Sequence, residues 1–98
     1  MAKTVFMTSL AEENFETVVK YLLANWSEKT AKNFVVKFER IYQFISDTPA
    51  LYPFINKEKR VQKCVLTKHN VLYFREDENA IIILDVFDTR QSPEKLKI

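Results

Sequence analysis

Two stretches of the chain repeat apolar residues with the period of an amphipathic helix. The apolar positions recur at intervals of three and four residues, which gathers them on one helical face. In the first stretch they are Phe15, Val18, Val19, Leu22, Leu23 and Trp26, and in the second they are Ala31, Phe34, Val35, Phe38, Ile41, Tyr42 and Ile45. We expect both faces to be buried in a hydrophobic core.

The ends of both helices carry sequence signals. Ser9, followed by Glu12 three residues later, has the spacing of a capping box and predicts the start of the first helix. Ser27 is placed to cap the second helix, which ends where Thr48 meets Pro49, because the residue before a proline disfavours helical geometry. So short a connection between the helices predicts a hairpin.

Strand-like segments rich in β-branched and aromatic residues lie on either side of this hairpin. The predicted strands are Lys3–Thr8, Arg60–Lys68, Val71–Glu76 and Ala80–Asp88. The last three are joined by short turns at residues 69–70 and 77–79, which requires an antiparallel meander. Pro49–Lys59 contains two prolines and has no clear period, so it is predicted to be a loop.

The last predicted strand is apolar on both faces, which is typical of a strand inside a covered sheet. We expect Ile82, Leu84 and Val86 on one face, and Ile81, Ile83 and Phe87 on the other. Asp85 is expected on the second of these faces, where a buried carboxylate needs a partner. Arg75 or Lys63 from a neighbouring strand is the expected partner.

The element order is therefore β-α-α-β-β-β. It predicts the α+β class, with a helical hairpin packed on a small, mainly antiparallel sheet in two layers. At 98 residues the chain has room for one hydrophobic core, and residues 1–98 are expected to form a single domain.

The composition excludes several kinds of binding site. The chain has no glycine, which excludes glycine-rich phosphate loops and leaves any position with positive φ to Asn, Asp or a strained residue. One cysteine and one histidine offer neither an intrachain disulfide nor a zinc cluster. We expect no metal and no cofactor. The sequence lacks the pattern of a signal peptide or a membrane span, so a cytoplasmic location is expected.

The chain as a whole resembles the RelE/ParE superfamily of bacterial toxins from type II toxin-antitoxin systems, known also as the plasmid stabilisation family. The residues that carry the resemblance are Ser9–Phe15, Val19–Leu22, Trp26-Ser27, Ala31, Phe34, Thr48-Pro49, Thr67–Phe74 and Ile83–Pro93. The resemblance implies a RelE/ParE-like fold and a cognate antitoxin as partner.

Members of this superfamily inhibit growth unless an antitoxin binds them, and they differ in target. RelE-like members cleave mRNA in the ribosome, and ParE-like members poison DNA gyrase. The long helical hairpin and the DTRQSP sequence of residues 88–93 resemble the ParE-like branch more closely. The resemblance thus implies a toxin that binds a target such as DNA gyrase. A ribosome-dependent mRNA endonuclease and a non-toxic member that only binds antitoxin are the alternatives.

Cleavage of mRNA requires a base, an acid and clustered cations. RelE-like nucleases supply these with basic residues on the middle strands, an arginine after the last strand and an aromatic residue or histidine near the C-terminus. Arg90 matches that arginine and Lys63 one strand lysine, whereas Asn70 and Leu96 stand where an arginine and an aromatic residue are expected. If the chain is an RNase, the implied catalytic residues are Arg90, Lys63, Lys68 and His69.

A binding toxin needs contact surfaces instead. The candidate target-binding residues are Arg60, Lys63, Tyr73, Arg75 and Arg90, and the candidate antitoxin-binding residues are Tyr21, Tyr42 and Lys57. Arg90 has a structural alternative, which is an ion pair with Asp88 or Asp85, because arginine suits both roles. The basic residues between Lys57 and Lys68 either bind an anionic partner or form solvated surface.

Overall fold

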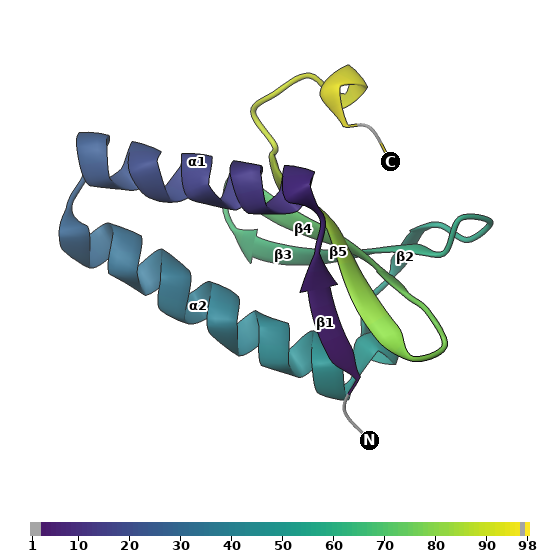
Figure 1. The fold of residues 1–98 in the computed structure, drawn as a ribbon. Helices are drawn as coiled ribbons and strands as arrows, with labels where there is room; N and C mark the ends of the chain where they lie inside the picture. The colour runs from purple at the N-terminus through teal and green to yellow at the C-terminus, as the bar shows by residue number, and fades with distance from the viewer. Residues whose placement is uncertain (1–2, 97) are drawn as a thin grey trace.

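The computed structural model describes residues 3–96 and 98, which form a helical hairpin packed on a five-stranded sheet (Figure 1). In chain order the elements are β1 (Thr4–Met7), α1 (Ser9–Asn25), α2 (Glu28–Asp47), the 3-10 turn η1 (Pro49–Leu51), β2 (Phe54–Asn56), β3 (Val61–Thr67), β4 (Asn70–Glu76), β5 (Ala80–Asp88) and the 3-10 turn η2 (Pro93–Lys95). No helix in the described part of the chain is long and apolar enough to cross a membrane.

The sheet has the strand order β1-β5-β4-β3-β2. The pairs β2–β3, β3–β4 and β4–β5 are antiparallel. The strand β1 runs parallel to β5, with Thr4 opposite Ala80. The α+β class, the predicted element order and the inner position of the last strand are confirmed. The prediction missed β2, a three-residue strand inside the segment that was expected to be a loop.

Side-chain caps fix where both helices begin. The cap of α1 is Thr8 rather than Ser9, and its hydroxyl oxygen accepts the N–H of Ala11 at 3.1 Å. The same hydroxyl donates to the carbonyl of Leu84 at 3.0 Å, which ties the start of α1 to β5. The predicted cap of α2 is confirmed, because Ser27 accepts the N–H of Thr30 at 3.1 Å.

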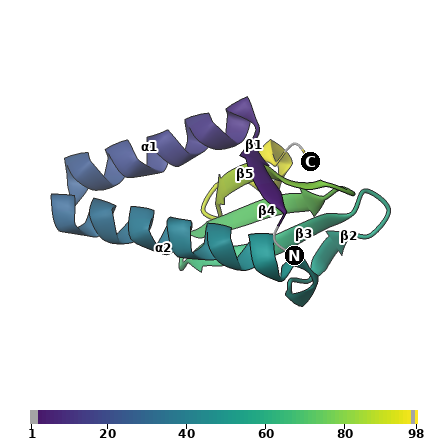
Figure 2. The same ribbon diagram turned by 60° about the horizontal axis from the view of Figure 1, so that its bottom comes forward.

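The two helices contribute unequally to the core. Helix α2 buries the predicted residues Ala31, Phe34, Phe38, Ile41 and Ile45. Helix α1 buries only Ala11 fully, and its residues Phe15, Val18, Val19 and Leu22 are half-buried against the core. The prediction is wrong for Leu23 and Trp26, which are 50% and 69% exposed, because the closed end of the hairpin extends beyond the sheet (Figure 2).

A β-bulge in β5 changes which face its residues occupy. Tyr73 pairs with Asp85 but the next residue, Phe74, pairs with Ile83, so Leu84 is left over. Ile81, Ile83 and Val86 consequently pack in the core under the helices, whereas Leu84 and Phe87 belong to a second cluster. The predicted assignment of faces is therefore wrong for Val86 and Phe87, whereas Leu84 lies opposite Ile83 as predicted.

The second cluster lies on the sheet face turned away from the helices, here called the outer face. Its buried members are Val61, Val71, Tyr73 and Phe87, and the partly buried Leu84, Leu96 and Ile98 pack against them. The segment that contains η2 runs on the opposite side of the sheet from α2 (Figure 1). The end of the chain thus covers part of the outer face.

The segment before β3 is anchored by side chains of the sheet. The amide of Gln62 donates to the carbonyls of Pro49 and Tyr52 at 2.7 and 3.0 Å, and the ring of Tyr52 packs edge-on against Phe74. Leu51 and Phe54 remain exposed. The turn that follows places Arg60 at φ 58°, the strained conformation expected of a chain without glycine.

Candidate functional site

A groove of about 610 Å³ lies between the helical hairpin and the ends of the strands. Its apolar wall includes Val18, Leu22, Phe34, Val86 and Phe87. Its polar lining includes Asn14, Asn33, Lys37, His69 and Arg90, and its aromatic lining includes Tyr21 and Trp26. The groove, which Asp88 also lines, therefore combines an apolar wall with polar and charged groups, which is the composition of a recognition site.

Arg90 is fixed at the edge of this groove by the turn after β5. The carboxylate of Asp88 accepts the backbone N–H of Arg90 at 2.9 Å, and it accepts Nε at 3.0 Å and Nη2 at 2.7 Å. The guanidinium also lies over the ring of Tyr21, at 5.7 Å from the centroid, within the range of a cation-π contact. Two elements therefore hold the orientation of Arg90.

This arrangement perturbs both ionisable groups. The hydrogen bonds from Arg90 hold the pKa of the Asp88 carboxyl below its ordinary value, and the same hydrogen bonds raise the pKa of Arg90. The predicted ion pair of Arg90 with Asp88 is confirmed, and the half-exposed side chain of Arg90 also lines the groove. It does not pair with Asp85.

Asp85 has a different partner from the one predicted. Its carboxylate accepts a hydrogen bond at 2.7 Å from the amide of Asn14 on α1, and the residue is 2% exposed. The expectation of Arg75 or Lys63 is wrong, since Arg75 pairs with Asp77 at the other end of β4. Asn14 also lines the groove and was not singled out in the sequence. Asn14 lies four residues before Val18, and this spacing places both on the same side of α1. The spacing is the sequence feature that could have indicated the position of Asn14.

The four candidate nuclease residues do not form one cluster. His69 and Arg90 both line the groove, and the carbonyl of His69 accepts the N–H of Thr89 at 2.8 Å. Lys68 is exposed in the turn before β4. Lys63 lies on β3 opposite Tyr73, which belongs to the outer-face cluster. In the described residues, Lys63 makes no ion pair or hydrogen bond with the other three.

The position expected to carry a nuclease arginine is structural. Asn70 is buried, and its side-chain oxygen accepts a hydrogen bond from the hydroxyl of Thr67 at 2.9 Å. Leu96, at the other open position, packs against the outer-face cluster. Neither side chain supplies a cation or a proton donor for RNA cleavage.

Lys63, Tyr73 and Arg75 lie on the outer face, as the alternation of β3 and β4 requires. Tyr73 is buried, and burial together with the charge of Asp85 raises the pKa of its hydroxyl. Arg75 is held by Asp77, with Nε at 3.1 Å from Oδ1. These three target-binding candidates thus share one surface, and Arg90 lies apart from them at the groove.

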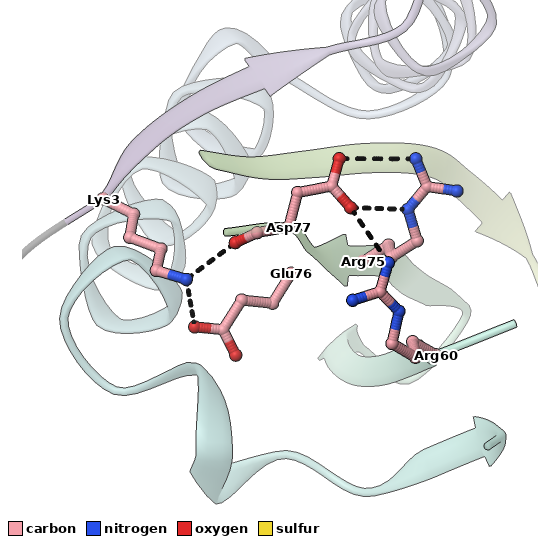
Figure 3. A network of polar contacts seen from close by, with 5 residues as sticks. All are labelled: Lys3, Arg60, Arg75, Glu76 and Asp77. Carbon is pink, nitrogen blue, oxygen red and sulfur yellow. Dashed lines mark hydrogen bonds and ion pairs between the residues drawn. The ribbon is translucent and has the colours of Figure 1, made fainter. Parts of the chain in front are cut away.

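A network of charged side chains lies at the C-terminal end of β4, here called its far end (Figure 3). Asp77 accepts hydrogen bonds from Arg75 and, at 3.5 Å, from Nη2 of Arg60. Lys3 donates to the backbone carbonyl of Asp77 at 2.7 Å and pairs with Glu76 at 2.9 Å. Arg60 and Arg75, both predicted as target-binding residues, are therefore brought together.

The three antitoxin-binding candidates lie in different environments. Tyr21 is 44% exposed and lines the groove. Tyr42 is half-buried and its hydroxyl donates to the carbonyl of Val5 at 2.7 Å, which ties α2 to β1. Lys57 is exposed in the turn before β3. Of the three, only Tyr21 lies at the groove.

The described residues contain no group of three His, Cys, Asp or Glu side chains that could hold a metal ion. The one cysteine, Cys64, is buried in the main core, where burial raises the pKa of its thiol. A thiol of this kind is a packing residue rather than a nucleophile.

The arrangement of helices and strands occurs in solved structures of bacterial toxin systems. A chain of the chromosomal ParDE toxin-antitoxin system from P. aeruginosa matches with a TM-score of 0.75 and 12% identity, over 89% of this chain and 96% of that one. A chain of the RelBE2 toxin-antitoxin complex from Mycobacterium tuberculosis matches with a TM-score of 0.60 and 17% identity, over 90% and 99%. The YoeB dimer from Staphylococcus aureus gives 0.63 and 17%, over 89% and 97%.

These similarities define the fold as the one shared by ParE, RelE and YoeB proteins. The family described as "ParE toxin of type II toxin-antitoxin system, parDE" matches residues 5–93. The chain therefore belongs to the ParE toxin family of type II toxin-antitoxin systems. The comparison with curated proteins gives no match.

Proposed function

We propose that this toxin inhibits growth by binding its target, such as DNA gyrase, and that a cognate antitoxin neutralises it. The observation that carries the proposal is the separation of the candidate nuclease residues. Lys63 lies on the outer face, whereas Arg90 is held by Asp88 at the groove. RNA cleavage needs its acid, base and cations around one phosphate. Binding has no such requirement.

The groove is the surface that we propose for the antitoxin. It offers an apolar wall for the apolar side of a helix or strand, and Lys37 in its lining suits an acidic residue beside that side. Solved neighbours of this chain include the YoeB-YefM complex from Staphylococcus aureus and the DinJ-YafQ toxin-antitoxin complex from E. coli. A partner of the same kind is therefore proposed here.

Inducible expression in bacteria tests the proposal. The chain alone is expected to arrest growth and to cause gyrase-dependent DNA damage while translated mRNA stays intact, and co-expression of the cognate antitoxin is expected to restore growth. Codon-phased mRNA cleavage would overturn the binding mechanism in favour of a ribosome-dependent endonuclease. Normal growth together with a tight antitoxin complex would identify a non-toxic member that has kept only antitoxin binding.

A pair of variants on α1 tests the antitoxin surface. Tyr21→Asp replaces an aromatic ring of the groove with a hydrated carboxylate beside Arg90, so antitoxin affinity is expected to fall at least tenfold, since the cost of removing water from a charge can exceed the gain from an ion pair. Leu23→Asp is the matched control, because Leu23 is similarly exposed on the same helix but does not line the groove. Equal losses in the two variants, measured by calorimetry, would place the antitoxin elsewhere.

A further inference from the structure

Two arginines at the far end of β4 share one carboxylate. Arg75 donates to both oxygens of Asp77, at 3.1 and 3.5 Å, and Arg60 reaches the same carboxylate through Nη2 at 3.5 Å (Figure 3). One carboxylate balances the charge of only one guanidinium, so a net positive charge remains. For Arg60 this long contact is its one side-chain hydrogen bond to the described residues. Most of its donors are therefore available to a ligand.

Arg60 is held in a conformation that costs free energy. Its φ of 58° lies in the left-handed region, which costs a non-glycine residue about 1–2 kcal/mol. The turn enforces this conformation, because Arg60 donates its N–H to the carbonyl of Lys57 and Asn56 accepts the N–H of Lys59. Backbone strain of this kind gathers at binding sites, where the surrounding structure holds it in place.

Both arginines line a hollow of about 430 Å³ on the outer face. The apolar part of its lining consists of Val61, Leu84 and Ile98, and the charged part consists of Glu58, Lys59, Arg60 and Arg75. Asp77 does not line the hollow, so it orients the two guanidinium groups from outside it. The hollow therefore combines three cations and one carboxylate with an apolar surface.

This chemistry matches a phosphate ester that carries a flat apolar group. A terminal phosphate bears about two negative charges and three acceptor oxygens, which suits two guanidinium forks better than a single carboxylate does. Guanidinium planes also stack on aromatic rings, and the apolar surface would receive a base. We propose that the hollow bounded by Arg60, Arg75, Val61 and Leu84 binds a nucleoside 5′-phosphate, either free or at the 5′ end of a nucleic-acid strand.

The inference is independent of how the toxin inhibits growth, and its test involves neither growth nor the antitoxin. The isotopically labelled full chain is titrated with adenosine 5′-monophosphate, adenosine and inorganic phosphate, with amide chemical shifts as the readout. The monophosphate is expected to shift the amides of residues 59–61 and 75 saturably and to bind at least tenfold more tightly than adenosine. If inorganic phosphate bound as tightly as the monophosphate, the proposed recognition of the nucleoside would be wrong. If the monophosphate caused no saturable shift, the proposed site itself would be wrong.

Matched variants separate a site from general charge attraction. Arg60→Asn removes the guanidinium while asparagine tolerates the left-handed conformation, and it is expected to weaken the monophosphate at least tenfold. Lys57→Gln removes one charge from the same turn without touching the hollow, and affinity should stay within about twofold. Similar losses in both variants would overturn the inference. If Arg60→Asn alters the turn, Arg75→Gln tests the same prediction by removing the other guanidinium of the hollow.

Two oligonucleotides that differ only in a 5′ phosphate distinguish the sources of the ligand. Preferential binding of the phosphorylated strand, lost in Arg60→Asn, supports a strand end as the ligand. If neither strand binds but the free monophosphate does, the ligand is a free nucleotide. Equal binding of both strands, unaffected by Arg60→Asn, would mean that the hollow does not recognise the phosphate.

Discussion

Asp85 is a buried charge at the contact between β5 and α1. It is 2% exposed, and the bulge at Leu84 turns it to where the amide of Asn14 donates to it at 2.7 Å. A buried carboxylate without its donor loses hydration that nothing replaces. The pair therefore fixes the depth at which α1 lies on the sheet.

Removal of the donor tests this role. Asn14→Ala is expected to lower the free energy of unfolding by about 1–3 kcal/mol, because Asp85 then lacks a partner. Asn33→Ala, a change of the same chemistry at an exposed position of α2, is expected to cost less than about 0.5 kcal/mol. Urea denaturation of both variants makes the comparison. Equal costs would show that the hydrogen bond to Asp85 is unimportant.

Asp88 links the position of Arg90 to pH. Its pKa is lower in the folded chain than in the unfolded chain, because Arg90 donates hydrogen bonds to the charged form. A lowered folded pKa stabilises the fold above the unfolded value of about 3.9, and this contribution is lost as the pH falls through the folded pKa.

Asp88→Asn is therefore expected to be less stable than the wild type at neutral pH, with the difference shrinking below about pH 4. Thermal unfolding from neutral to acidic pH measures it. Asp47→Asn, at an exposed position on α2, serves as the control. A difference between Asp88→Asn and wild type that stays constant with pH would contradict the assignment.

The turn of residues 57–60 is the element in which the lack of glycine has a structural cost. Arg60→Gly removes the left-handed strain and is expected to raise the free energy of unfolding by about 1 kcal/mol. The lost contact with Asp77 is an exposed one and opposes this only weakly. Lys59→Gly, one residue earlier and outside the positive-φ region, is expected to lower stability by about 0.5–1 kcal/mol. Chemical denaturation distinguishes the two, and stabilisation by both would contradict the argument.

Both helices and four of the five strands were predictable from sequence, whereas β2 and the bulge in β5 were not. The second helix and its cap at Ser27 followed from periodicity that its packing preserves. The strand β2 has three residues, too few to show an alternation, and it forms because β3 offers a neighbouring edge. The bulge at Leu84 was not predictable either, because it depends on how β4 and β5 pair and the sequence of β5 alone does not determine this pairing.

At the scale of the whole molecule, sequence placed candidate residues on elements but not at common sites. Arg60 and Arg75, separated by 15 positions in the chain, meet at Asp77 because β3 and β4 are antiparallel. Trp26 was expected in the core and lies exposed beside the groove, because a periodic stripe does not reveal where the sheet ends. Lys37 also lines the groove, and no feature of the sequence predicted this position.

The parallel pairing of β1 with β5 also bears on how the toxin is made. The strand β1 finds its neighbour only after residues 80–88 have been synthesised, and β5 also completes the pairing of β4. Contacts between segments so distant in sequence form late in folding. The groove and the hollow both use residues of β5, so neither surface exists on a partly synthesised chain. A ribosome that has not yet translated β5 therefore carries a chain on which neither the groove nor the hollow has formed.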